Sequence, residues 1–90
     1  MTSYDLEAII TLLDRHRQRA TYGAVAKYLG VAAQGVMQGL PRTPRYSWVV
    51  NAELEYPTGY DPAALHPELF ANGGVIDTGE MLAEWLEAMG

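Results

Sequence analysis

Two glutamines, Gln34 and Gln38, are the side chains whose type and spacing most directly fit a recognition chemistry. They fall four residues apart in a stretch, residues 32–39, that we expect to be helical. A glutamine amide can form two hydrogen bonds with the edge of an adenine in the major groove. Glutamine also occurs on helix surfaces with no partner but water. The pair is therefore a candidate base-reading site, and the surrounding elements decide whether it can meet DNA.

Basic residues cluster around this stretch although the net charge of the chain is −5. All six lie between positions 15 and 45, a window without Asp or Glu, and eight of the eleven acids follow position 45. This asymmetry predicts one positive and one negative face, and a phosphate backbone responds to the local field. Part of the run also suits the C-terminal dipole of a helix. The cations that remain as candidate phosphate contacts are Lys27, Arg42 and Arg45.

Catalytic constellations are not recognisable in this sequence. Ser47 lacks the glycine-flanked setting of a hydrolase nucleophile, and His16 and His66 lie fifty residues apart without further ligands at metal spacing. The absence of cysteine excludes disulfides, cysteine zinc ligands and a thiol nucleophile. We expect a protein that is not an enzyme and needs no metal or cofactor.

Residues 21–40 predict a helix-turn-helix. Thr21 is a natural N-cap for a helix over residues 22–29, and Gly30 can end it in a left-handed conformation. Ala26 permits close approach of the second helix, residues 32–39, whose Val36 faces inward. The shared core is expected to comprise Val25, Leu29, Val31 and Val36. An ordinary αα-hairpin remains the alternative.

The flanking elements predict a winged form of this motif. Ser3 is expected to cap an N-terminal helix with an apolar stripe at Leu6, Ile9, Ile10 and Leu13. After a basic, non-helical connector, residues 41–45, a strand is expected over 46–50, followed by a turn or wing over 51–60 with a possible partner strand. Asp61 and Pro62 open one short turn. Asp77 or Thr78 caps a last helix whose stripe should pack on the first helix: Leu82, Trp85, Leu86 and Met89.

The expected fold is therefore mainly α with a small β wing, a winged helix-turn-helix formed by one domain over residues 1–90. It has three N-terminal helices, two short strands and a C-terminal helix. No apolar run is long enough to cross a bilayer, and the first residues lack a signal-peptide pattern. We expect a cytoplasmic protein.

Several short motifs resemble the C-terminal DNA-binding domain of the alkylguanine-DNA alkyltransferases and their non-catalytic alkyltransferase-like relatives. The resemblance covers about residues 6–51 and rests on Thr21-Tyr22-Gly23 with Val25-Ala26, Ala32-Ala33-Gln34 with Val36, and Val49-Val50 after the connector. It implies a helix-turn-helix in the minor groove and Tyr22 against a DNA phosphate. Gln34 would stand where the family has an arginine that fills the gap left by a flipped nucleotide.

Departures from the family pattern limit what the resemblance implies. Arg45-Tyr46-Ser47-Trp48 replaces the Pro-Cys-His-Arg of the active-site motif, so the chain has no alkyl acceptor. An aromatic residue in place of the cysteine is similar to the alkyltransferase-like proteins. Gln34 also removes a cation from the groove.

Two functions follow as hypotheses. The first is non-catalytic binding of duplex DNA, with damaged-base recognition as a special case, through Tyr22, Lys27, Gln34, Gln38, Arg42 and Arg45. The alternative is a protein-interaction module on the same scaffold. Its contacts would be made by Trp48, the loop over residues 56–60 or the acidic C-terminal half.

Overall fold

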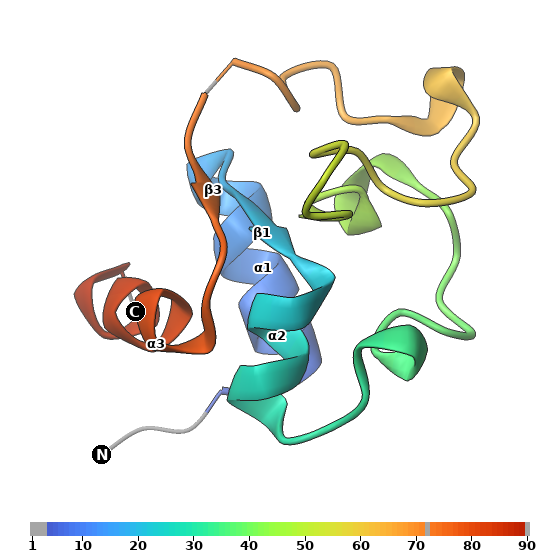
Figure 1. Cartoon of the computed structure of the whole chain (residues 1–90). Helices are drawn as coiled ribbons and strands as arrows, with labels where there is room; N and C mark the ends of the chain where they lie inside the picture. Colours follow the sequence, from blue (N-terminus) through green and yellow to red (C-terminus); the bar gives the residue numbers. More distant parts are fainter. Residues whose placement is uncertain (1–3, 72, 90) are drawn as a thin grey trace.

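A three-stranded parallel sheet with the order β2-β1-β3 joins segments far apart in the chain of this computed structural model, which describes residues 4–71 and 73–89 (Figure 1). The strands are β1 (Arg19–Thr21), β2 (Val49–Val50) and β3 (Val75–Ile76). Ala20 in the central strand pairs with both Val49 and Ile76. With helices α1 (Leu6–His16), α2 (Tyr22–Leu29) and α3 (Gly79–Met89), the described chain is a small mixed α/β fold.

The parallel sheet corrects two predictions. Of the expected strand over 46–50, only β2 forms, because residues 44–46 make the 3₁₀ turn η2 (Pro44–Tyr46). The last residues of the connector, which was expected to be non-helical, belong to this turn. Residues 51–60 form turns and supply no partner strand. Parallel pairing requires a long crossover between partners, and the segment from α2 to Trp48 provides it. The central strand was missed because it has only three residues.

Helix α1 follows the predicted apolar stripe, and Ile9, Ile10 and Leu13 are fully buried. Asp5 caps it by accepting a 2.8 Å hydrogen bond from the Ala8 N–H. Ser3, the expected cap, lies outside the described residues. The helix ends at Arg17, whose backbone is left-handed with φ 56°.

Helix α2 has the predicted ends. The Thr21 hydroxyl accepts a 3.0 Å hydrogen bond from the Ala24 N–H, and Gly30 terminates the helix at φ 74°. A residue with a Cβ would be strained at that angle. Val25 and Ala26 are buried as expected, whereas Val31 is 53% exposed and does not belong to the core.

The predicted helix over residues 32–39 is wrong. Only one 3₁₀ turn forms there, η1 (Ala33–Gly35), and Gly39 adopts φ 83°. Two glycines each cost a helix about 1 kcal/mol relative to alanine, and Pro41 disfavours helix at the residue before it. Val36 still packs inward, as predicted, so this irregular segment is anchored at its middle.

Helix α3 begins after Thr78, whose hydroxyl accepts from the Met81 N–H at 3.1 Å. Leu82 and Leu86 are buried. The helix packs chiefly on α2 and touches α1 less, contrary to the prediction. Gly79 makes the close approach possible, since a Cβ there would lie 2.8 Å from Lys27 Cγ.

The buried side chains form one cluster, and Trp48 lies within it. Its Nε1–H donates to Asp14 Oδ1 at 2.9 Å, which links the residue before β2 to α1. The predicted cap at Asp61 is confirmed, since its Oδ1 accepts from the Ala63 N–H before η3 (Pro62–Ala64). Across the described ranges, none of the helices combines the length and apolar content needed to cross a bilayer.

Candidate functional site

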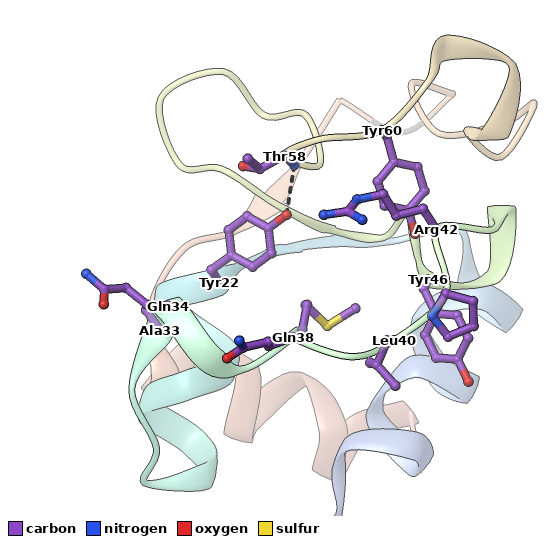
Figure 2. Close-up of a pocket in the computed structure, with 11 residues that line it drawn as sticks. Tyr22, Ala33, Gln34, Gln38, Leu40, Arg42, Tyr46, Thr58 and Tyr60 are labelled. Carbon is purple, nitrogen blue, oxygen red and sulfur yellow. Dashed lines mark hydrogen bonds between the residues drawn. The ribbon is translucent and has the colours of Figure 1, made fainter.

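A cavity of about 440 Å³ opens between the start of α2, the irregular segment after it and the loop that carries Thr58 and Tyr60 (Figure 2). Pockets that hold small organic ligands typically enclose about 300–1,000 Å³. The walls carry three tyrosines together with amide, thioether and guanidinium groups. The lining residues are Tyr22, Ala33, Gln34, Met37, Gln38, Leu40, Pro41, Arg42, Tyr46, Thr58 and Tyr60.

Tyr22 forms the wall at the start of α2. The Thr21 cap fixes the first turn of the helix, so the ring of the next residue projects from a rigid position. Its hydroxyl oxygen accepts a 2.8 Å hydrogen bond from the Thr58 N–H. Figure 2 shows this bond spanning the gap between the helix and the loop. The hydroxyl proton remains available for a ligand, since this bond uses only a lone pair.

Arg42 and Tyr60 form the wall opposite Tyr22. Gly59 has φ 76°, and a Cβ at this residue would lie 3.1 Å from both Nε and Nη2 of Arg42. The glycine therefore lets the guanidinium rest against the loop backbone. The Tyr60 hydroxyl donates to the Thr43 carbonyl at 3.0 Å, so both side chains have defined positions.

Burial raises the pKa of Tyr60 to about 12, and the neighbouring Tyr22 adds to this effect while Arg42 opposes it. The hydroxyl of Tyr60 is therefore neutral throughout the physiological range. A neutral phenol presents no negative charge to an incoming anionic ligand. This wall of the pocket combines one permanent cation with an uncharged aromatic ring.

Gln34 and Gln38 border the pocket on the irregular segment, and both are exposed. They are not on a helix face as predicted, because residues 33–39 run as a 3₁₀ turn followed by further turns. Met37 is half-buried and packs against the core cluster. The two amides and the thioether therefore all line the same cavity.

Two predicted DNA contacts lie outside this lining. Lys27 places its Cβ and Cγ against Gly79 at the start of α3. Arg45 donates hydrogen bonds to Glu7 at 3.4 Å and to Thr11 at 2.9 Å. Burial lowers the pKa of Arg45, but hydrogen bonds with Tyr46 and Glu7 outweigh it and raise that pKa overall. Four of the six predicted residues therefore meet at the pocket: Tyr22, Gln34, Gln38 and Arg42.

Ion pairs reduce the positive face that the sequence predicts. Three of the six basic residues pair with glutamates from outside the basic window, and each pair reduces the field presented to solvent. The pairs are Arg17 with Glu68, Arg19 with Glu55 and Arg45 with Glu7. Among the described residues that line the pocket, Arg42 is the only arginine, so it supplies positive charge there.

Three further pocket residues escaped the sequence analysis: Tyr46, Thr58 and Tyr60. Tyr46 was assigned to a strand and Tyr60 to a wing or a protein contact. The sequence signals a turn at Thr58-Gly59-Tyr60, but only the structure places this turn against Arg42 and Thr43. The alternative that Trp48 makes an exposed contact is wrong, because its side chain is 0% exposed.

The pocket offers flat rings for stacking, amides for hydrogen bonding and one cation for a negative group. That set matches a planar heterocycle attached to an anionic chain better than a purely apolar ligand. Comparison of the chain with protein-family models, with curated proteins and with solved structures finds no significant match. The function is therefore inferred from the geometry of this pocket and from the motifs around it.

Proposed function

We propose that this chain is a non-catalytic protein that binds duplex DNA, and that its tyrosine-lined pocket receives a base extruded from the duplex. The observation that carries the proposal is the meeting of Tyr22, Tyr60 and Arg42 around one cavity. The rings offer stacking surfaces, and the guanidinium lies where a phosphate attached to the base can be neutralised.

The energetics favour a base that is already weakly paired. Stacking on an aromatic side chain contributes about 1–3 kcal/mol per base. Extrusion of a base from an intact Watson–Crick pair costs about a few kcal/mol. A damaged or mismatched base costs less to extrude, so the same pocket would bind it more tightly. The amides of Gln34 and Gln38 can then hydrogen-bond to its edge.

The resemblance to alkyltransferase-like proteins adds a specific ligand to this proposal. It implies that Tyr22 meets a phosphate, and its hydroxyl can donate there while its oxygen accepts from Thr58. The absence of cysteine leaves no acceptor for an alkyl group. The proposed role is therefore recognition of alkylated guanine without repair of the base by this chain.

The acidic residues of α3 lie away from the proposed DNA face. Figure 1 shows α3 on one side of α2 and the segment over residues 33–46 on the other. The exposed acids of this helix are Glu80, Glu84 and Glu87. Their position limits repulsion of a phosphate backbone at the pocket, because exposed charges are screened within about 10 Å at moderate salt.

The test is a salt-titrated anisotropy assay with two labelled duplexes that differ by a single alkylated guanine. We expect binding that weakens as salt rises, and tighter binding of the alkylated duplex. Tyr22→Ala should remove that preference, while Glu84→Ala on α3 serves as a matched surface control. Undetectable or salt-independent binding would contradict DNA binding itself; equal affinity for the two duplexes would contradict only the damaged-base part.

A further inference from the structure

Leu54 and Phe70 are the most exposed large apolar side chains of the described residues, at 74% and 57%. Neither lines the pocket described above. Single exposed apolar residues are common on protein surfaces. These two differ because Arg19 contacts both the turn that carries Leu54 and the ring of Phe70.

Phe70 is fixed by two contacts. The guanidinium carbon of Arg19 lies 5.0 Å from the centre of its ring, and the ring of Tyr56 stacks on it at 6.4 Å with 22° between the planes. Arg19 belongs to the central strand and is itself buried. Arg19 and Tyr56 thus hold the Phe70 ring in place while more than half of the side chain stays exposed to solvent. Little conformational freedom is therefore lost when a partner covers the ring.

Leu54 is held by a tight turn over residues 51–56. The Asn51 side-chain oxygen accepts from the Glu53 N–H at 2.8 Å and from the Leu54 N–H at 3.3 Å. Glu55 has a left-handed backbone with φ 56°, which residues other than glycine seldom adopt. Such strained positions are found preferentially at functional sites.

Arg19 connects this turn to Phe70. Its Nη1 donates to the Glu55 carbonyl at 3.1 Å while its guanidinium lies against the Phe70 ring. Tyr56, two residues after Leu54, stacks on the same ring. Tyr56 and Phe70 therefore form a stacked pair, and Leu54 lies on the turn that Arg19 joins to this pair. We call these three residues the Leu54–Phe70 patch.

Acidic residues surround the Leu54–Phe70 patch. Glu53 and Glu55 are exposed on either side of Leu54, and Glu68 is exposed two residues before Phe70. Residues 46–71 contain neither lysine nor arginine. Glu55 and Glu68 pair with Arg19 and Arg17 from outside this range, whereas Glu53 forms no ion pair with the described residues, so the three glutamates outnumber the two arginines at the rim. An apolar centre with a negative rim repels phosphates and attracts cationic groups.

We propose that the Leu54–Phe70 patch binds a protein segment that presents an apolar side chain between lysine or arginine residues. This goes beyond the proposed DNA binding, because the patch shares no residue with the pocket lining. The apolar side chain covers Leu54 and Phe70. A flanking cation meets Glu53, because Glu55 and Glu68 are already paired with Arg19 and Arg17. Aromatic anchors surrounded by polar contacts are the usual centres of such interfaces.

The test selects a displayed library of random short peptides against the folded protein, with Leu54→Ser protein as the counter-selection. Leu54→Ser keeps the backbone bonds of the turn and removes only an exposed side chain. We expect enriched peptides to combine one large apolar residue with neighbouring Lys or Arg. Their binding, followed by amide chemical shifts, should map to residues 52–56 and 68–71 and weaken about tenfold or more in Leu54→Ser.

Two further variants sharpen the result. Glu53→Lys changes only the rim and should weaken the same peptides, whereas Met81→Ser, an exposed apolar residue on α3, should not. No enrichment, enrichment of peptides without basic residues, or shifts that map to α3 would overturn the proposal. So would concentration-dependent shifts of the patch in the protein alone, which indicate a second copy as the occupant. Weaker duplex binding by Leu54→Ser would assign the patch to DNA instead, and unchanged duplex binding separates the two proposals.

Discussion

The hydroxyl of Tyr22 accepts a 2.8 Å hydrogen bond from the backbone N–H of Thr58, across 36 residues of chain. One end of this bond lies at the capped start of α2, and the other lies in the loop that presents Gly59 and Tyr60. The two walls of the pocket are therefore linked directly by a single side chain. The width of the pocket depends on this link as well as on the core beneath it.

Tyr22→Phe should leave the ring in place and remove the link. Thr58 is exposed, so water can replace the lost partner, and we expect a stability loss of only about 0.5 kcal/mol. Amide exchange at Thr58 should accelerate, and duplex affinity should fall about tenfold if the hydroxyl also donates to a phosphate. Tyr28→Phe is the matched control, because the Tyr28 hydroxyl accepts from the Tyr4 N–H away from the pocket. Equal effects of the two variants on duplex affinity would argue against a special role for Tyr22.

Arg42→Ala and Arg45→Ala should differ in salt dependence. Arg42 lies at the pocket, so its loss should lower the slope of log K against log salt by about 0.9, the value for one phosphate contact. Arg45 is already engaged by Glu7 and Thr11, so its loss should change the slope less. Anisotropy titrations over a range of salt concentrations measure both slopes. A slope for Arg42→Ala equal to that of the parent protein would contradict the phosphate contact of Arg42, and equal reductions in both variants would contradict the distinction between the two arginines.

Tyr60 should ionise later than an ordinary tyrosine. Its pKa is about 12 in the folded protein against 10.0 for the free side chain, because burial disfavours the phenolate. The unfolded chain releases this proton first as pH rises, so the contribution to stability is complete below pH 10 and is lost between pH 10 and about 12. Tyrosinate absorbance should show one late step that disappears in Tyr60→Phe. Arg42→Ala should move that step to still higher pH, since the guanidinium lowers the pKa of Tyr60.

Gly79→Ala should separate α3 from α2. The added Cβ would lie 2.8 Å and 2.9 Å from Lys27 Cγ and Cβ and 3.3 Å from the Tyr28 nitrogen, atoms that cannot swing away. Overpacking of this kind costs about 1–3 kcal/mol, more than the helix gains from alanine, and thermal unfolding should begin several degrees lower. Gly73→Ala is the control, since nothing lies within 4 Å of its added Cβ. A Gly79→Ala protein as stable as the parent would mean that α3 can shift without loss.

Local signals in the sequence were reliable where each involves only a few neighbouring residues. The cap at Thr21, the left-handed end at Gly30, the α1 stripe and the Asp61 cap are all confirmed. Each depends on contacts within one or two turns of chain. The helix predicted over residues 32–39 was wrong because the prediction gave more weight to the helix-turn-helix motif than to the helix-destabilising effect of Gly35, Gly39 and Pro41.

Long-range contacts could not be predicted in the same way. Ala20 pairs with Val49 on one side and with Ile76 on the other. Strands of only two or three residues are too short for their sequences to indicate which segments pair. The hydrogen bond from Trp48 to Asp14 likewise joins residues that are 34 positions apart in the chain. Trp48, which was expected at the surface, is therefore part of the core. The ion pairs of Arg17, Arg19 and Arg45 show the same limit for charge.

The sequence by itself determined the apolar stripe of α1, the ends of α2, the uncharged chemistry of Gln34 and Gln38, and the lack of a thiol for alkyl transfer. Only the tertiary structure decided that the sheet is parallel, that α3 packs chiefly on α2, and that Tyr22, Arg42 and Tyr60 surround one cavity. Caps and apolar stripes depend on neighbours in the chain. The pocket depends on the Tyr22–Thr58 and Tyr60–Thr43 hydrogen bonds, which form only after distant segments have packed on a common core.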